Sequence, residues 1–229
     1  MKIILYFLQY IFIKLFFLIC KIIGFKKASN FGKFVGEKIG PIFKSKAIIK
    51  KNINLILPNT SQENIDIITK KMWGNYGRIL SEYVFLEGFR KGSLEKYLNI
   101  TGLEYLNEIK RKNIPVVFIS GHFNNFELMA MQIEKSGLEL GAIYRPLNNF
   151  FLNSTMENIR KKFICRNQIK KGLSGIREIL NLFKKNISIA LMIDQRVTEG
   201  IKSTFFKKEA FTTTIPAQLV KKFGCPVVS

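Results

Sequence analysis

The spacing of apolar positions changes near residue 98 and divides the chain into two parts. Before this point apolar residues recur every three or four positions, as on one face of a helix. After it, short β-branched and aromatic runs alternate with helical patterns, which is typical of an α/β sheet covered by helices. We therefore expect a mixed sheet within residues 98–229, preceded by a helical, membrane-associated region at 28–97 and an anchor segment at 1–27.

The same patterns predict individual elements of the second part. Strands are expected near Ile100 and at Val116–Ser120, Leu140–Tyr144 and Ile187–Ile193. Helices are expected at Leu103–Ile109, Asn125–Ser136, Asn153–Phe163 and Ser174–Lys184.

A long helix is expected after Pro58, because Thr60 and Glu63 have the spacing of a capping box. Seven apolar residues follow at steps of three and four, and we expect their stripe to lie in the core. They are Ile65, Ile68, Met72, Tyr76, Ile79, Leu80 and Tyr83.

The segment Ile3–Ile23 decides the compartment. Apart from Gln9, Lys14 and Lys21 it is apolar, and as a helix it is long enough to cross roughly 30 Å of hydrocarbon. Lys14 costs about 2.5–3.5 kcal/mol, whereas about fifteen Ile, Leu and Phe residues at about 0.3–0.6 kcal/mol each contribute more. Insertion is therefore expected; a helix that lies in the interface with both lysines pointing outward is the alternative.

Charge is strongly unbalanced: 37 basic and 16 acidic residues give a net charge of +21. Such an excess favours an anionic partner, which phosphorylated lipid, acidic protein and nucleic acid would each satisfy. Eight lysines lie between Lys26 and Lys51 whereas Lys2 alone precedes the apolar segment, so the positive-inside rule places the body on the cytoplasmic side. These lysines would also face anionic lipid.

Several kinds of site are disfavoured. Cys20, Cys165 and Cys225 are widely spaced, which argues against a disulfide framework or a thiolate zinc site. A single histidine without a cluster of further ligands also argues against catalytic zinc. The stretch Gly172-Leu-Ser-Gly175 has the wrong spacing for the nucleophile elbow of a serine hydrolase.

Polar residues follow three of the predicted strands. His122 comes after the first, Arg145 after the second, and Asp194 with Gln195 after the third. Because ligands of open α/β sheets bind beyond the carboxyl ends of the strands, we expect these side chains to converge on one edge.

His122 and Glu127 together suggest a chemistry. If His122 precedes a helix and Glu127 lies in its first turn, the carboxylate can accept the imidazole Nδ1 proton and hold the tautomer. The Nε2 atom is then available as a general base for a hydroxyl. Since a serine nucleophile and zinc are disfavoured, direct transfer of an acyl group to a hydroxyl is the reaction that fits.

These residues also carry a family resemblance. The stretch Gly-His122-Phe-Asn-Asn-Phe-Glu127 resembles the H-x-x-x-x-D/E box of glycerolipid-type acyltransferases. Together with the N-terminal segment and further motifs, it makes the chain similar to the lipid A biosynthesis (lauroyl/myristoyl) acyltransferase family of the bacterial inner membrane. The further motifs are Met72–Arg78 with Glu82, Ile143–Asn149, Met192–Gln195, Thr204 with the two phenylalanines after it, and Thr212–Pro216.

The resemblance implies an acyltransferase at the inner membrane with its body on the cytoplasmic side. It implies that a fatty acyl chain moves from acidic acyl carrier protein to a hydroxyl of a phosphorylated lipid A precursor, as a late secondary acylation in lipopolysaccharide biosynthesis. On this basis His122 is the base and Glu127 its partner, Arg145 serves phosphate or the developing oxyanion, and Asn125, Asp194 and Gln195 contact substrate. No cofactor, metal or nucleic acid is implied.

Three departures from the family pattern carry expectations. Asn124 stands where a glycine is usual, and since Asn tolerates turn conformations we expect the turn to form, with Phe126 as an aromatic wall. Lys207 also replaces a usual glycine, so we do not expect the turn after it to follow the family pattern. Family members continue beyond the stretch Lys221–Ser229, where a helix enters a strand, so we expect this chain to be a fragment.

Three alternatives remain open at this stage. An acyltransferase for a glycerophospholipid or another glycolipid would use the same histidine box. A basic, membrane-associated nucleic-acid-binding protein would explain the charge, although no recognition motif is present. A purely structural membrane protein would explain the anchor but leaves His122 and Glu127 without a role.

Overall fold

The structure is a computed structural model that describes residues 1–195, 197 and 200–229. By its internal contacts the chain forms two compact units. Unit 1 consists of Met1, Ile3–Phe85 and Phe206–Lys208, and unit 2 of Lys2, Leu86–Phe205 and Glu209–Ser229. Compact units are not the same as functional segments, so the division at 27/28 and 97/98 stays a prediction.

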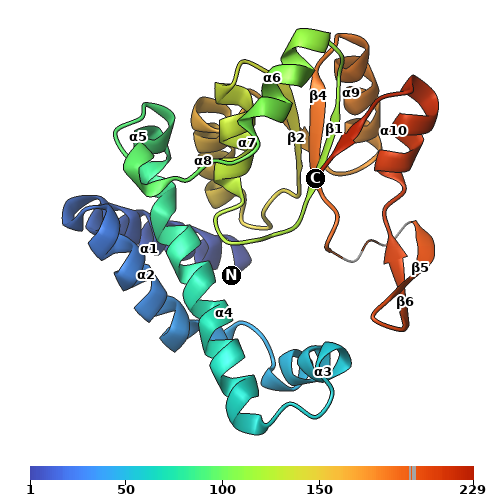
Figure 1. Ribbon diagram of the computed structural model, residues 1–229. Coiled ribbons are helices and arrows are strands. Elements are labelled where there is room, and N and C mark those ends of the chain that lie inside the picture. The colour runs from blue at the N-terminus through green and yellow to red at the C-terminus, as the bar shows by residue number, and fades with distance from the viewer. Residues whose placement is uncertain (196, 198–199) are drawn as a thin grey trace. The chain divides into compact units, whose positions relative to one another are not determined.

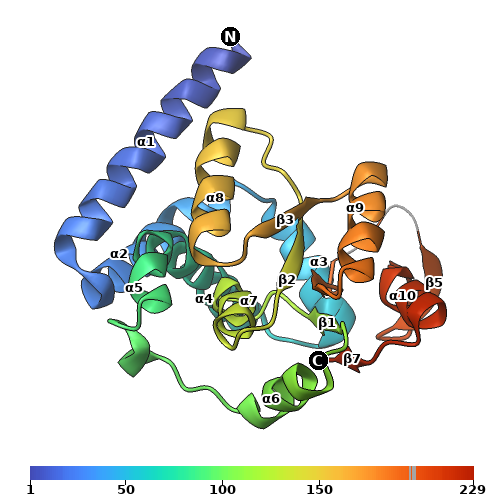
Figure 2. The same cartoon turned by 90° about the horizontal axis from the view of Figure 1, so that it is seen from above.

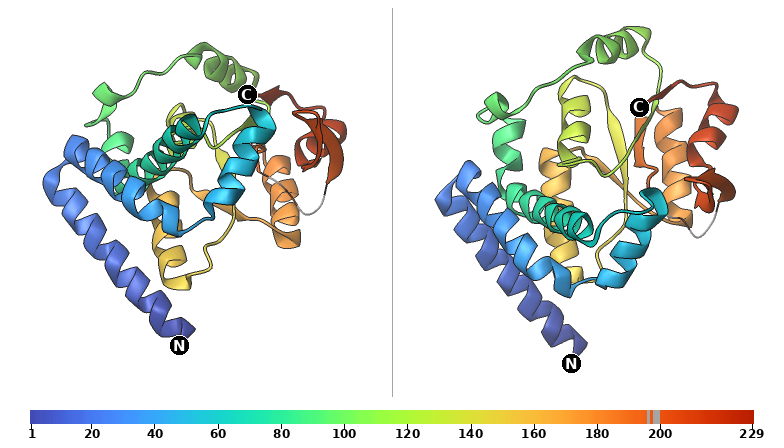
Figure 3. Two further views of the ribbon diagram at one scale, coloured as in Figure 1. Left: turned by 90° about the horizontal axis from the view of Figure 1, so that it is seen from below. Right: turned by 60° about the horizontal axis from the view of Figure 1, so that its bottom comes forward.

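Unit 1 is helical. Its elements are α1 (Lys2–Ile23), α2 (Phe25–Ile39), the 3₁₀ helix η1 (Gly40–Ile42), α3 (Lys46–Ile56), α4 (Gln62–Glu82) and the 3₁₀ helix η2 (Tyr83–Phe85). Gly24, with φ +78°, breaks the helical run between α1 and α2, and α2 leads through η1 towards α3 (Figure 3). By length and composition α1 is a candidate membrane span, in agreement with the apolar pattern of Ile3–Ile23.

Glycines set the close packing of α2 against α4. A Cβ on Gly32 of α2 would overlap the Gly77 carbonyl oxygen, and a Cβ on Gly77 would overlap the Gly32 carbonyl oxygen. A Cβ on Gly36 would likewise overlap the carbonyl oxygen of Trp73. The two helix backbones therefore touch, an approach that small residues alone permit. A partly buried hydrogen-bond chain adds to it, because Arg78 donates to the Ser29 hydroxyl (2.8 Å), which donates to Glu82 (2.7 Å).

Two expectations for α4 are corrected. Its N-cap is Ser61, whose hydroxyl accepts from the Asn64 N–H at 3.3 Å, whereas the Thr60 hydroxyl turns back to the Leu57 carbonyl (2.7 Å). The apolar stripe is also not uniformly core. Its members Ile68 and Tyr76 are 37% and 53% exposed, because they line an open groove that α4 forms with α3.

Unit 2 holds the predicted sheet. Its five strands are β1 (Val117–Ser120), β2 (Leu140–Tyr144), β3 (Asn167–Lys170), β4 (Ser188–Met192) and β7 (Val227–Val228). They lie in the order β3-β2-β4-β1-β7, and every pairing is parallel (Figure 1). The α/β class is confirmed, and the sheet, expected to be mixed, is parallel.

Helices cover both faces of this sheet. They are α7 (Glu127–Lys135), α8 (Phe150–Phe163), α9 (Leu173–Lys184) and α10 (Ile215–Phe223). Unit 2 also contains α5 (Leu86–Arg90), which packs against α7 and α8, the 3₁₀ helix η3 (Glu95–Tyr97) and α6 (Leu103–Lys112). Figure 2 shows α7 and α8 on one side of the sheet and α9 and α10 on the other. Right-handed crossovers require this arrangement, since the chain moves from β1 outward to β3 and then returns to β4 and β7.

The direction of the chain connections reverses between two central strands, β1 and β4. From β1 the chain leaves through α7 towards β2, and from β4 it leaves in the opposite direction, through α10, towards β7. Neighbouring strands whose connections diverge form the switch point at which α/β sheets bind ligands. Beneath it lies an apolar core that includes Val117, Ile189, Leu191, Phe183 and Leu219.

Some predicted elements differ from the structure. Residues 98–102 around Ile100 have no regular secondary structure and lead to Gly102, whose φ of +84° precedes α6. The edge strand β3 was missed because Asn167 to Lys170 are largely polar. Helix α8 begins at Phe150 rather than Asn153, because the Asn149 side chain accepts from the N–H groups of Phe151 and Leu152.

Two further strands, β5 (Ile201–Phe205) and β6 (Lys208–Thr212), form a separate hairpin. Phe206 and Lys207 make its turn with φ of +48° and +61°. Both residues thus occupy the left-handed region that a two-residue turn of this type needs and that Asn-Gly fills most readily. The turn therefore forms with Lys207 in a conformation that glycine adopts more readily.

Candidate functional site

The β1–β4 register places His122 beside Asp194. Ser120 of β1 pairs with Met192 of β4. His122 follows Ser120 by two residues, and Asp194 follows Met192 by two residues. The imidazole Nδ1 lies 2.8 Å from Asp194 Oδ1, and the His122 backbone N–H donates to Asp194 Oδ2 at 2.7 Å. One carboxylate therefore holds both the ring and the chain of His122 at the switch point.

The electrostatics of this pair favour an ionised Asp194. Burial alone would raise the pKa of the carboxyl group, but hydrogen bonds from the backbone and imidazole of His122, together with the imidazole charge, lower the Asp194 pKa below its ordinary value. An ionised carboxylate accepts the proton of Nδ1–H, and in the tautomer with its proton at Nδ1 the lone pair of the ring is at Nε2. This is the tautomer that a general base requires.

The surroundings of the ring fit a reactive group. The His122 side chain is 26% exposed, which leaves the imidazole accessible. The Gln195 amide nitrogen lies 3.4 Å from Nε2, and the Phe126 ring packs edge-on against the imidazole at 4.7 Å between centroids. Phe126 is thus the aromatic wall expected from the sequence, and Asn124 adopts a φ of +46°, as expected for a residue in the place of glycine.

Glu127 has a different position from the predicted one. Its carboxylate, buried at the first residue of α7, accepts from Arg160 Nε at 2.9 Å and also pairs with Arg160 Nη2. The Nδ1 partner of His122 is Asp194, so the prediction that Glu127 accepts this proton is wrong in its geometry.

Arg160 connects Glu127 to a second group of polar residues. Its guanidinium lies 5.7 Å from the centre of the Tyr144 ring, and the Tyr144 hydroxyl donates to Glu157 at 2.7 Å. Burial and the hydrogen bond to Glu157 raise the pKa of Tyr144, which stays a neutral donor. These contacts fix Arg160 beside the last residue of β2.

The remaining predicted site residues lie near the same edge without joining the dyad. Arg145 follows β2 directly and is exposed, and no hydrogen bond or ion pair is recorded for it among the described residues. Asn125 lies half-buried in the turn between His122 and Glu127. The structure thus brings His122, Asp194 and Gln195 into contact, and Glu127 with Arg160 forms a neighbouring pair.

Sequence reasoning missed Arg160. It stands before two lysines in the last turn of α8, where a basic run usually marks a solvated surface and a favourable end for the helix dipole. Its 18% side-chain exposure cannot be read from that pattern. In the part of the chain that the structure describes, no three His, Cys, Asp or Glu side chains gather closely enough to hold a metal ion.

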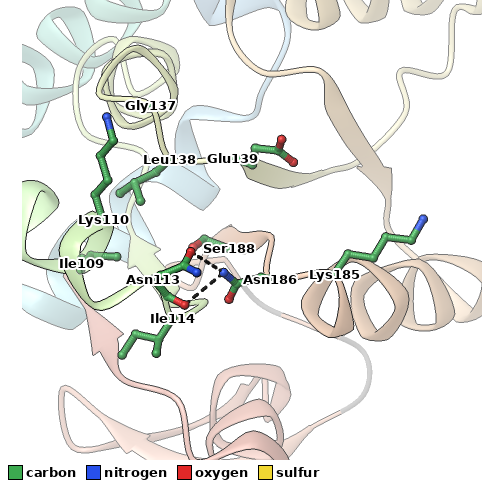
Figure 4. A pocket seen from close by; sticks show the side chains of 10 residues that line it. All are labelled: Ile109, Lys110, Asn113, Ile114, Gly137, Leu138, Glu139, Lys185, Asn186 and Ser188. Carbon is green, nitrogen blue, oxygen red and sulfur yellow. Dashed lines mark hydrogen bonds between the residues drawn. The ribbon is translucent and has the colours of Figure 1, made fainter.

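A cavity of about 270 Å³ lies at the opposite ends of the strands from His122 (Figure 4). Asn113 precedes β1, Leu138 and Glu139 precede β2, and Ser188 opens β4, so the cavity sits at the amino ends of the strands. The Asn186 amide closes part of it by donating to Asn113 Oδ1 at 2.8 Å. His122 does not line this cavity.

Comparison with known proteins identifies the family. The family of bacterial lipid A biosynthesis acyltransferases matches this chain over all of its residues, 1–229. The chain belongs to this family. The resemblance carried by the histidine box and the motifs after β2 and β4 is thereby confirmed.

Individual members of the lipid A acyltransferase family are distant in sequence. The chain is 26% identical over 195 residues to the lipid A biosynthesis palmitoleoyltransferase of Escherichia coli (strain K12) and likewise to the lipid A biosynthesis acyltransferase of Shigella flexneri; each match covers 79% of this chain and 60% of the relative. It is 22% identical over 135 residues to the lipid A biosynthesis myristoyltransferase of Escherichia coli (strain K12), which covers 59% of this chain and 41% of the relative. The chain thus spans about 60% of the length of the first two relatives.

Proposed function

We propose that this protein transfers a fatty acyl chain to a hydroxyl group of a phosphorylated lipid A precursor, as a late secondary acylation. The single observation that carries the proposal is the His122–Asp194 pair at the switch point of the sheet, in a chain of the lipid A acyltransferase family. The donor in the proposal is the thioester of acyl carrier protein.

The proposed reaction uses His122 as general base. Nε2 accepts the proton of the acceptor hydroxyl while the oxygen attacks the thioester carbonyl carbon. Asp194, held at Nδ1, stabilises the imidazolium that forms. As the tetrahedral intermediate collapses, the carbon–sulfur bond breaks, the ester carbonyl re-forms, and the imidazolium returns its proton to the leaving thiolate.

The cations near this edge have separate proposed roles. Arg145, exposed at the end of β2, binds a phosphate of the acceptor or stabilises the oxyanion of the intermediate. Arg160 is already held by Glu127, so this pair positions the turn after β1 and the end of β2. Gln195 and Asn125 orient the acceptor at the switch point.

The charge and the first helix support the proposed partners and location. Acyl carrier protein is acidic and the acceptor carries phosphates, so a net charge of +21 favours the encounter with both. In the proposal α1 anchors the protein in the bacterial inner membrane, and the lysines between Lys26 and Lys51 keep the body on the cytoplasmic side.

The test is an acyl-transfer assay on membranes that contain the protein, with acyl carrier protein thioester as donor and a phosphorylated lipid A precursor as acceptor, followed by mass spectrometry. The wild type should add one acyl chain, and His122→Ala should abolish the addition. The matched control is Lys71→Ala, an exposed change in α4 that should leave the product unchanged. Transfer by His122→Ala at the wild-type rate would refute the role of the histidine.

A second acceptor is tested in the same assay, because the histidine box also fits acyltransferases of glycerophospholipids. Lysophosphatidic acid is offered in place of the lipid A precursor, at the same donor concentration. Acylation of this lipid alone would keep the His122 chemistry and overturn the proposed acceptor.

A further inference from the structure

An exposed surface in unit 1 combines apolar and basic side chains. We call it the α3 surface and define it by its residues, which run from the last residue of η1 to the residue after α3. They are Ile42, Phe43, Lys44, Lys46, Ile48, Lys51, Leu55 and Leu57.

Large apolar side chains dominate this surface. Ile42 and Phe43, at the turn before α3, are 81% and 77% exposed, and Ile48, Leu55 and Leu57 are each about half exposed. Single exposed apolar residues are ordinary, but five within sixteen residues form a patch of the kind that marks a contact with a partner or a membrane. The opposite side of α3 faces α4, because Ile49 is buried and Ile53 lines the open groove between the two helices, which Lys44 also lines.

Positive charge accompanies this patch without any acidic residue. No Asp or Glu occurs between Glu37 and Glu63. Lys44, Lys46 and Lys51 have no ion pair recorded among the described residues, whereas Lys50 donates to Gln62 at 2.7 Å. An apolar helix face flanked by lysines is the pattern of a segment that lies in the membrane interface and binds anionic headgroups.

We propose that the α3 surface is a second membrane contact, in which Ile42, Phe43 and the exposed face of α3 enter the interface of an anionic phospholipid bilayer. The candidate membrane span α1 belongs to the same compact unit, so insertion of α1 would bring this surface close to a bilayer. The three lysines would face lipid phosphates while the apolar side chains enter the acyl boundary. This contact goes beyond the anchoring by α1 and does not depend on the proposed acyl transfer.

An acidic protein is the competing partner, since it would also match the lysines. The observations favour the bilayer because a carrier protein needs a polar rim around its contact, whereas Ile42 and Phe43 stand exposed side by side at the tip of the surface. The competing partner is kept as an outcome of the test.

The test uses fluorescence of an indole placed on the surface. Phe43→Trp is made in the full chain, and the signal of the natural single tryptophan, Trp73, is subtracted with the wild type. The protein is reconstituted into phosphatidylcholine vesicles with and without phosphatidylglycerol, with lipids that carry bromine on their acyl chains as quenchers. Tyr10→Trp in α1 is the positive control, and Tyr105→Trp, which introduces an exposed indole in unit 2, is the matched comparison.

The expected result is quenching of the indole introduced by Phe43→Trp, stronger when phosphatidylglycerol is present. In a further variant that adds Lys44→Gln, Lys46→Gln and Lys51→Gln, the dependence on phosphatidylglycerol should disappear, while sedimentation with vesicles through α1 persists. Absence of quenching in both kinds of vesicle would overturn the proposal. So would a spectral change that appears with acyl carrier protein and not with lipid, which would assign the surface to an acidic protein.

Discussion

Asp194 Oδ1 lies 2.8 Å from His122 Nδ1, although 72 residues separate the two along the chain. The same carboxylate accepts from the backbone N–H of His122 at 2.7 Å. Asp194 therefore fixes the orientation of the ring in two ways, and this sets the first prediction.

Asp194→Asn should lower kcat by about 10²–10⁴-fold with a smaller change in KM, because an amide does not stabilise the imidazolium that forms during transfer. The measurement is steady-state acyl transfer from acyl carrier protein to the lipid acceptor. Asp194→Glu is the matched variant and should recover part of the rate. A rise in KM with kcat unchanged would contradict the role given to Asp194.

Glu127→Leu should destabilise unit 2 by about 3–5 kcal/mol, because it leaves the guanidinium of Arg160 largely buried without its carboxylate. Arg160→Leu should cost a similar amount, and the double variant should recover much of the loss. Equilibrium unfolding in urea measures all three. Additive losses in the double variant would show that the two side chains do not act as a pair.

Acid should remove the stabilisation that Asp194 provides. Because the folded state lowers the Asp194 pKa, this contribution is present above the pKa of an unfolded aspartate, about 3.9, and is lost as pH falls through the folded value. The difference in unfolding free energy between wild type and Asp194→Asn should therefore shrink as pH falls below about 4. A difference that stays constant from neutral to acidic pH would exclude the ionised pair as its source.

Gly77→Ala should destabilise unit 1 by about 1–3 kcal/mol, since the added methyl group overlaps the carbonyl oxygen of Gly32. The measurement is thermal unfolding followed by circular dichroism in detergent. Lys71→Ala, an exposed change on the same helix, is the control and should alter the melting temperature little. An unchanged melting temperature for Gly77→Ala would refute the close approach of α2 and α4.

Lys207→Gly should stabilise the β5–β6 hairpin by up to about 1 kcal/mol, because glycine adopts a φ of +61° without the steric cost borne by lysine. Amide hydrogen exchange of β5 and β6 reports this directly and should slow. Lys208→Gly, in the strand just beyond the turn, is the matched control and should speed exchange. Faster exchange in Lys207→Gly would show that the turn carries no strain.

Much of unit 2 could be predicted from the sequence because its central strands are short apolar runs. β2 has the predicted bounds, and β1 and β4 differ from them by one residue at the ends. The edge strand β3 was missed because Asn167 and Lys170 break the apolar pattern, and its buried Gln168 is satisfied locally by the Cys165 carbonyl at 3.0 Å.

The partner of His122 could not be predicted for a different reason. Spacing along the chain places Glu127 near His122, whereas the contact with Asp194 depends on the β1–β4 register, in which Ser120 faces Met192. A register between strands 72 residues apart is not encoded in any local pattern. Sequence reasoning placed His122, Arg145 and Asp194 at one edge, but it could not tell which of them touch.

Because β1 pairs with β4 across a long stretch of chain, we expect the His122–Asp194 pair to form late in folding. The imidazole and its carboxylate meet once a loop of more than 70 residues has closed, and such long-range pairing is slow to form. Recovery of the proposed acyl transfer during refolding should therefore lag behind the return of the helical signal, and the delay would report when β1 and β4 have paired.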